Sequence, residues 1–294
     1  MAVRACLPVT PRSGMVVAPA DRNVPRAGSS SDVCILTDRV KLVQHMINVT
    51  ALVAAAKARQ PWLNLSQCAN LAPAGTGTGT LYALLKRYSR HAHHIHDRLT
   101  AELTGRGAHC LFITVRDPVH RLVSGWKLEG IPIHRNAYLR FAAPHSNGSL
   151  ARFVDAFSNA TDTDHQAVVR YWAHSVGRNG LLDRAGKEWG HGQVGSQFLK
   201  SQASYLHQVP PDGVTVHFLC TEQLANGAAN LLAGQGLDGD ADHIPHEHVR
   251  AHAVPATAAA QAPLALSAAQ ERVVRDDMFP WDTQLHRIVC GSHS

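Results

Sequence analysis

The stretch from Cys110 to Lys127 constrains the fold more than any other part of the chain. It begins with an apolar run, Leu111 to Val115, whose shortness and β-branched residues predict a buried strand rather than a helix. An arginine and an aspartate then end the strand, and Pro118 stands where the first turn of a helix accepts a residue without an N–H. Apolar residues recur at helical spacing as far as Trp126. The stretch therefore predicts a strand that leads directly into a helix.

The junction between this strand and this helix suits an anion. A helix N-terminus offers free N–H groups and the positive end of the helix dipole, and Arg116 adds a permanent cation with a fork of donors. The hydroxyl of Ser124, two turns into the helix, can donate one more hydrogen bond. The structural alternative is a plain corner in which Arg116 pairs with Asp117 or with another nearby carboxylate.

A second strand, loop and helix precede the first. Trp62–Leu71 predicts a strand, residues 72–80 read A-P-A-G-T-G-T-G-T, and Leu81–Tyr88 consists of good helix formers. Glycines let backbone N–H groups converge on a phosphate, and threonines add hydroxyl donors. Alternating Gly and Thr is also typical of a flexible linker. The position of this loop, one βα unit before Cys110, favours phosphate binding.

The string R-D-P-x-x-R-x-x-S-x-W at residues 116–126 resembles the 3′-phosphate-binding segment of the sulfotransferases that use 3′-phosphoadenylyl sulfate (PAPS), most closely the Golgi carbohydrate group. This resemblance implies that Arg116 and Ser124 bind the 3′-phosphate, with Arg121 as the next candidate. The glycine–threonine run resembles the family's 5′-phosphosulfate loop. That loop then consists of Gly75, Thr76, Gly77, Thr78, Gly79 and Thr80.

One position departs from the family pattern. The lysine of the family's loop falls on Gly75, so the resemblance predicts a loop without the cation that meets charge on the leaving group. Activity is therefore less secure than nucleotide binding. The alternative to an enzyme is a nucleotide- or glycan-binding protein that kept the scaffold and lost catalysis.

Later motifs follow in the family's order. Gln197–Leu206 resembles the segment ahead of the next strand and makes Gln202 a nucleotide-binding candidate. Val214–Leu219 predicts that strand, and Thr221 then has the character of a helix cap. Residues 281–285 resemble the family's C-terminal helix. The resemblance implies a three-layer α/β/α, P-loop-like fold with a central parallel sheet over residues 61–294, after a poorly ordered leader and an N-terminal helix in residues 1–60.

Sulfonate transfer to a hydroxyl needs a base that removes the acceptor proton. A neutral histidine suits this step near pH 7, and four histidines lie between residues 91 and 96. His94 and His96 are the candidates from that run, and Glu129 is the carboxylate alternative. The run also has metal-ligand spacing, but only Asp97 accompanies it, so we expect no metal.

Composition agrees with an anionic ligand. The net charge is +6, from 28 basic and 22 acidic residues. The basic residues are scattered rather than clustered, which disfavours nucleic acid. The resemblance to the sulfotransferases, rather than the composition, implies PAPS as the co-substrate and a carbohydrate or glycoconjugate as the acceptor, modified on a hydroxyl rather than an amine.

Cysteines and glycosylation triplets bear on the compartment. Three of the six cysteines lie in or beside predicted core strands and are expected to be free, buried thiols: Cys68, Cys110 and Cys220. Four N-x-S/T triplets favour the Golgi lumen or the secretory pathway, and they begin at Asn48, Asn64, Asn147 and Asn159. No signal peptide or membrane anchor is visible in the sequence, so a cytoplasmic location stays open.

Overall fold

The structure is a computed structural model of the 294-residue chain. It describes residues 48–58, 65–71, 73, 75–88, 94–95, 109–129, 149–177, 197–203, 205, 214–237 and 264–291. Within these ranges the chain forms a parallel sheet of four strands in the order β2-β1-β3-β4. The strands are β1 (Cys68–Leu71), β2 (His94–Ile95), β3 (Cys110–Val115) and β4 (Thr215–Cys220). Strands alternate with helices, so the fold is α/β.

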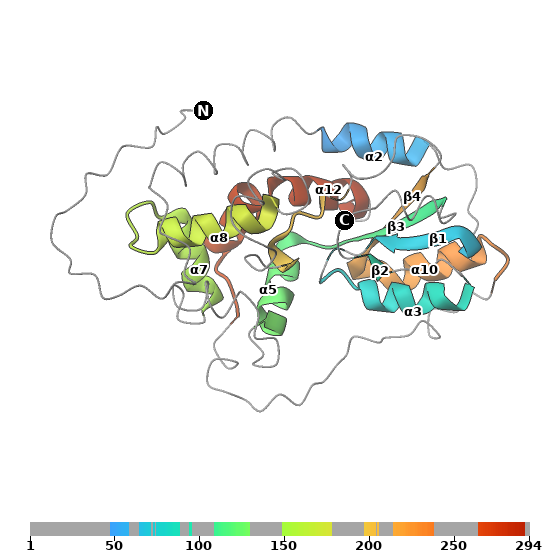
Figure 1. Cartoon of the computed structure of the whole chain (residues 1–294), viewed down its shortest axis with the longest axis horizontal. Helices are drawn as coiled ribbons and strands as arrows, with labels where there is room; N and C mark the ends of the chain where they lie inside the picture. The colour runs from blue at the N-terminus through green and yellow to red at the C-terminus, as the bar shows by residue number, and fades with distance from the viewer. Residues whose placement is uncertain are drawn as a thin grey trace, which may run out of the picture.

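Helices cover both faces of this sheet (Figure 1). Side chains alternate between the faces of a strand, and Leu111 and Ile113 of β3 point to one face while Phe112 points to the other. The first face packs on α2 (Val49–Ala58) and α12 (Pro280–Cys290). The second packs on α3 (Thr78–Tyr88) and α10 (Leu224–Ala233). All six residues of β3 are buried, as the apolar run predicts.

The turn after β3 is built as the sequence predicts. The helix α5 (Pro118–Glu129) begins at Pro118. The carboxylate of Asp117 caps it, because Oδ1 accepts hydrogen bonds from the backbone N–H groups of Val119 (2.9 Å) and His120 (3.0 Å). The other carboxylate oxygen lies 3.3 Å from Nε of Arg275. Asp117 thus fills the anion position at this helix N-terminus, and its ion-pair partner is Arg275 rather than Arg116.

A helical region lies beside the sheet, at the left of Figure 1. It contains the helices α7 (Leu150–Ser158) and α8 (His165–Gly177). They pack with α5 and with the π-helix η7 (Val273–Met278) in one hydrophobic cluster. The aromatic side chains of α8, Tyr171 and Trp172, are both buried there and belong to the core.

The remaining elements include one whose bounds differ from the sequence prediction. The predicted strand Trp62–Leu71 is a 3₁₀ helix η1 (Leu65–Gln67) followed by β1. Helix α11 (Ala268–Arg272) leads directly into η7. The described ranges also contain the 3₁₀ helices η2 (Gln197–Leu199) and η4 (Thr221–Gln223). No helix in the described part of the chain is both long and apolar enough to cross a membrane.

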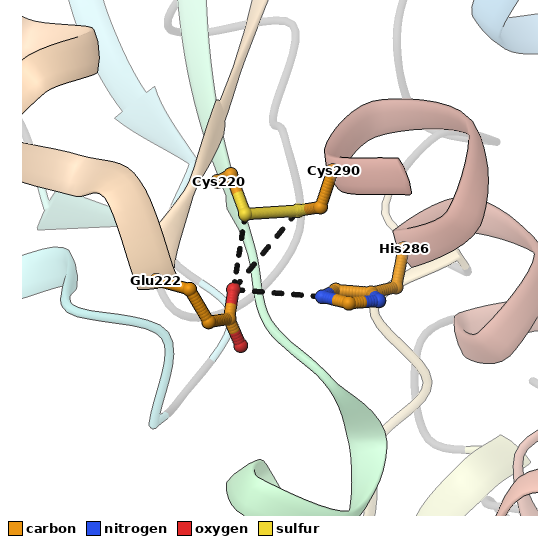
Figure 2. A group of neighbouring side chains, drawn as sticks. All are labelled: Cys220, Glu222, His286 and Cys290. Carbon is orange, nitrogen blue, oxygen red and sulfur yellow. Dashed lines mark hydrogen bonds and ion pairs between the residues drawn. A yellow bond between two sulfur atoms is a disulfide. The ribbon is translucent and has the colours of Figure 1, made fainter. Parts of the chain in front are cut away.

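The prediction of free thiols at Cys68, Cys110 and Cys220 is wrong. Cys68 and Cys110 are register partners on neighbouring strands, with Cα atoms 4.3 Å apart, and they form a disulfide. Cys220 forms a second disulfide with Cys290 of α12 (Figure 2). The Cα atoms of Cys220 and Cys290 are 5.4 Å apart, within the usual range for a disulfide, and the 4.3 Å of the first pair lies at the lower edge of that range. Pairing depends on strand register and helix packing, which cysteine spacing along the chain does not give.

His217 of β4 predicts a pH dependence of stability. Its ring lies 5.3 Å from that of Phe112, and its Nε2 is buried with no hydrogen-bond partner among the described residues. Burial lowers the pKa of His217 below its usual value of 6.5. The unfolded chain therefore takes up a proton that the folded chain resists, so the free energy of unfolding falls as the pH drops through the unfolded pKa.

We expect His217→Gln to lose less stability than the parent chain when the pH falls from about 7.5 to about 5.5. Urea unfolding at each pH measures this change. An unchanged slope in His217→Gln would assign the pH dependence to other groups.

Candidate anion-binding site

Three turns meet at the carboxyl edge of the sheet. They are the loop after β1, Arg116–Asp117 after β3, and Thr221–Glu222 after β4. The chain goes from β1 to β2 on one side and continues with β3 and β4 on the other. The strand order therefore reverses between β1 and β3. In open α/β sheets, ligands bind outside the carboxyl ends of the strands at such a reversal.

The loop after β1 is shaped by two glycines and one buried threonine. Gly75 and Gly77 have φ values of 79° and 74°, in the left-handed region that favours glycine. Thr76 between them is fully buried. Its hydroxyl donates to the carbonyl of Pro73 (2.6 Å) and contacts the hydroxyl of Thr114 on β3 (2.7 Å). Thr76 thus anchors the loop through its side chain.

A residue after β4 fixes the same loop from the other side. The hydroxyl of Thr221 donates to the carbonyl oxygen of Thr76 at 2.8 Å. The prediction that Thr221 caps its helix is therefore wrong, because the hydroxyl binds the loop instead. The loop is therefore held by Thr114 of β3 and by Thr221, which directly follows β4.

The helix α3 begins directly after this anchored loop. The helix has no acidic residue in its first turn, and its entry bond runs from the N–H of Leu81 to the carbonyl of Gly77 at 3.4 Å. In the described part of the chain, no group accepts a hydrogen bond from the N–H groups of Thr78, Gly79 or Thr80. Unpaired N–H groups at the positive end of a helix of 11 residues attract an anion.

Arg116 adds a cation beside this helix end. Its Nη1 donates to the carbonyl of Gly75 at 2.9 Å, so the guanidinium lies against the glycine-rich loop. Burial lowers the pKa of Arg116, and the carboxylates of Glu222 and Asp117 oppose that effect. Because an arginine pKa lies far above 7, the side chain stays charged.

Gln202 holds the backbone of Arg116. Its Oε1 accepts from the N–H of Arg116, and its Nε2 donates to the carbonyl of the same residue, both at 2.9 Å. The side chain is fully buried. Gln202 therefore positions Arg116, and its amide is already engaged in that role.

Arg121 is turned towards the core. It is 1% exposed, and its Nη1 lies 3.3 Å from Oδ2 of Asp282. Asp282 also accepts hydrogen bonds from the Ser201 hydroxyl (2.6 Å) and from the backbone N–H groups of Gln202 (2.9 Å) and Ala203 (3.1 Å). This buried pair ties α5 to α12 and argues against direct phosphate contact by Arg121.

The remaining candidates are less fully described. Ser124 is half-buried on α5. His94 lies in β2 and Glu129 ends α5, and only their backbones are described. His96 lies outside the described residues. The geometry therefore brings together the loop, Arg116 and Gln202, while the proton acceptor stays a sequence prediction.

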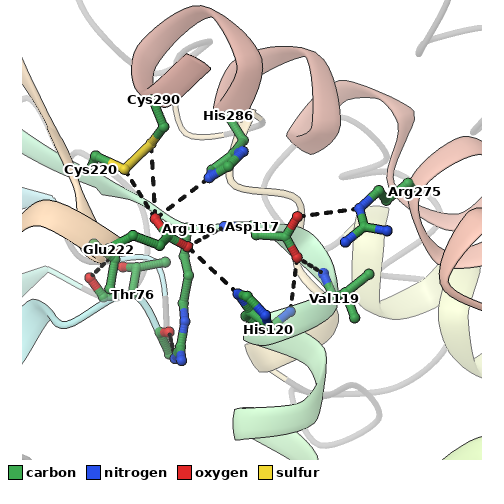
Figure 3. A network of polar contacts seen from close by, with 12 residues as sticks. Thr76, Arg116, Asp117, Val119, His120, Cys220, Glu222, Arg275, His286 and Cys290 are labelled. Carbon is green, nitrogen blue, oxygen red and sulfur yellow. Dashed lines mark hydrogen bonds and ion pairs between the residues drawn. A yellow bond between two sulfur atoms is a disulfide. The ribbon is translucent and has the colours of Figure 1, made fainter. Parts of the chain in front are cut away.

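Glu222 is the neighbour of this site that the sequence interpretation did not single out (Figure 3). Its Oε1 accepts from the backbone N–H of Asp117 at 3.0 Å. Burial raises the pKa of Glu222, but the contact with His286 and the N–H of Asp117 outweigh it and lower the pKa to about 2. Glu222 is thus an ionised carboxylate at neutral pH and a poor base. Its place directly after a strand was the signal available in the sequence.

Comparison of the chain with family models, curated proteins and solved structures found no match.

Proposed function

We propose that this chain is a sulfotransferase that moves a sulfonate group from PAPS to a hydroxyl, or with less support an amine, of a carbohydrate. The observation that carries the proposal is the open N-terminus of α3, with the Arg116 guanidinium beside it at the reversal of strand order. A nucleotide with a phosphate on each side of its ribose needs donors for two anions. In this proposal the α3 N-terminus serves one of them and Arg116 the other.

In this proposal the 5′-phosphosulfate lies over the glycine-rich loop, and the N–H groups of Thr78, Gly79 and Thr80 donate to it. Arg116 leaves the Gly75 carbonyl to bind the 3′-phosphate, with the Ser124 hydroxyl as a second donor. The acceptor oxygen attacks sulfur, the bond from sulfur to the phosphate oxygen breaks, and adenosine 3′,5′-bisphosphate leaves. A base takes the acceptor proton, with His94, His96 and Glu129 as candidates. The scheme needs no metal.

Helices on both faces of the sheet support a three-layer α/β/α arrangement of the P-loop-like kind. The disulfides support the location in the secretory pathway, because disulfides persist in oxidising compartments. The triplet asparagines Asn48 and Asn159 are both exposed, as glycosylation requires.

The backbone conformation and the crowding at position 75 explain why this loop has glycine there rather than lysine. Besides its positive φ, a Cβ at this position would come within 3.1 and 3.2 Å of the Phe198 ring. A lysine here would be strained by its backbone and crowded by Phe198. The second candidate function, a binding protein without catalysis, rests on this missing cation.

Arg116→Ala should weaken the binding of adenosine 3′,5′-bisphosphate about tenfold or more, because a hydrogen bond to a charged group contributes about 1.5–3 kcal/mol. Titration calorimetry measures the affinity. Binding of adenosine 5′-phosphate, which lacks the 3′-phosphate, should hardly change. Arg87 is exposed near the far end of α3 and provides the control Arg87→Ala. Equal losses for both nucleotides would make Arg116 a structural residue.

Transfer itself separates the two candidate functions. A sulfotransferase moves label from ³⁵S-labelled PAPS to a glycan in a panel of acceptors, and the binding protein does not. Adenosine 3′,5′-bisphosphate should raise the melting temperature in both cases. The absence of any such shift would overturn both.

A further inference from the structure

Four metal-binding side chains meet next to the candidate anion-binding site but outside it (Figure 2). Cys220 ends β4 and Glu222 lies in η4, while His286 and Cys290 lie on α12. His286 and Cys290 are four residues apart, which places them on the same face of the helix. One donor atom from each side chain lies within 4.8 Å of all the others.

The distances suit a tetrahedral ion. Zn²⁺ binds sulfur at about 2.3 Å and nitrogen or oxygen at about 2.0–2.2 Å, so neighbouring ligand atoms of a tetrahedron lie about 3.3–3.8 Å apart. Oε2 of Glu222 lies 3.5 Å from Nε2 of His286, 3.0 Å from Sγ of Cys220 and 4.0 Å from Sγ of Cys290. The Cys220 distance is slightly short of this range and the Cys290 distance slightly beyond it, so small side-chain shifts bring both within it. The large change is between the two bonded sulfurs, which need to separate by about 1.7 Å.

The two non-sulfur donors are already oriented. The N–H of Asp117 occupies Oε1 of Glu222 and leaves Oε2 towards the sulfurs. Nε2 of His286 is buried and faces Oε2 of Glu222 at 3.5 Å, so it already points into the cluster. Neither sulfur of a disulfide carries a hydrogen, so the sulfur–carboxylate approaches in Figure 2 are contacts rather than hydrogen bonds. The N–H of Asp117 is thus an outer partner that fixes the Glu222 carboxylate, an arrangement typical of metal sites.

We propose that, once the Cys220–Cys290 disulfide is reduced, Cys220, Glu222, His286 and Cys290 bind one Zn²⁺. A dithiol supplies two electrons and two protons, the sulfur–sulfur bond breaks, and the dithiol becomes a disulfide. Zn²⁺ then displaces the two thiol protons to solvent. The ion is held by two thiolates, the Nε2 of an imidazole and a carboxylate oxygen.

Four protein ligands close the coordination sphere, which is the pattern of a structural rather than a catalytic zinc site. The ion replaces the disulfide as the link between β4 and α12. The oxidised and the zinc-bound chains are therefore two states of one crosslink. This inference does not depend on the proposed sulfotransferase function.

Zinc binding by the full chain tests the proposal. The protein is reduced with a trialkylphosphine, which forms the phosphine oxide and leaves no competing dithiol. Zn²⁺ alone is then titrated against a chromophoric chelator. We expect one Zn²⁺ per reduced chain, and no such site in the oxidised chain. Co²⁺ in its place should show thiolate charge-transfer absorption, which histidines elsewhere in the chain cannot produce.

Variants separate this cluster from the other cysteines. Cys220→Ser with Cys290→Ser should abolish the site, and Cys68→Ser with Cys110→Ser should retain it. His286→Ala can be purified with its disulfide intact and reduced afterwards, so a folding defect does not confuse the result. Its zinc affinity should fall about a hundredfold or more, since even loss of an outer partner costs about 10–100-fold. A zinc affinity close to that of the parent protein in Cys220→Ser/Cys290→Ser or in His286→Ala overturns the proposal. Reduced parent protein that binds no Zn²⁺ overturns it as well.

Discussion

Asp282→Asn should lower the free energy of unfolding by about 3–5 kcal/mol, the usual cost of removing one partner from a buried ion pair. The carboxylate is fully buried and faces Arg121, which is 1% exposed. An asparagine removes the carboxylate charge that faces this buried arginine. It also has one acceptor oxygen where Asp282 uses two for Ser201, Gln202 and Ala203. Urea unfolding monitored by circular dichroism measures the loss.

Two further variants serve as comparisons for Asp282→Asn. Asp276 is exposed on η7, so Asp276→Asn should change stability little. Arg121→Met in the Asp282→Asn background removes the buried positive charge that has lost its carboxylate and should recover part of the loss. A loss no greater than that of Asp276→Asn would show that the pair contributes little. Because Asp282 also holds the segment that carries Gln202, the Arg116 backbone should lose order along with stability.

Gly125→Ala should destabilise the protein even though alanine is the better helix former by about 1 kcal/mol. Gly125 lies inside α5, and a Cβ there would overlap the Cβ and the ring of Phe198. The overlap involves atoms near the Phe198 backbone, which a change of rotamer cannot move away. Overpacking costs about 1–3 kcal/mol or more, so we expect a net loss of about 2 kcal/mol. Thermal and urea unfolding measure it.

The matched control is Gly227→Ala in α10, where the new Cβ would meet only the end of the Leu219 side chain at 3.2 Å. That variant should be close to neutral. Phe198→Ala should relieve the effect of Gly125→Ala, so the two changes together should be less harmful than the sum of their single effects. Additive losses would mean that Phe198 is not the obstacle. Phe198 also approaches Gly75, so moving it should disturb the glycine-rich loop as well.

The parts of the fold that local pattern determines could be predicted from the sequence. The strand at Cys110–Val115 is a single apolar run, and α5 starts at Pro118 because proline and the preceding aspartate suit a helix start. The glycine-rich loop was placed correctly between a strand and a helix. Each of these features depends on residues within a few positions of one another.

Features that depend on distant pairs could not be predicted. Arg121 and Asp282 are 161 residues apart, and nothing in either neighbourhood shows that they meet in the core. The open helix N-terminus is that of α3 rather than that of α5, because the Asp117 side chain folds back onto its own helix. The role of Thr221 depends on the loop after β1, 145 residues earlier. Such contacts need the register of the sheet, which the sequence does not specify.

The two disulfides lie one after the other along the chain, since the first spans 42 residues and the second 70, with no overlap. The second loop neither encloses nor crosses the first, so each removes unfolded conformations independently. A chain pulled from its ends would keep both loops closed. Together they withhold about 370–400 Å of extension at about 3.3–3.6 Å per residue. Force alone can straighten the section from Cys110 to Cys220, which lies outside both disulfide loops. This section contains β3 after its first residue, α5, α7 and α8.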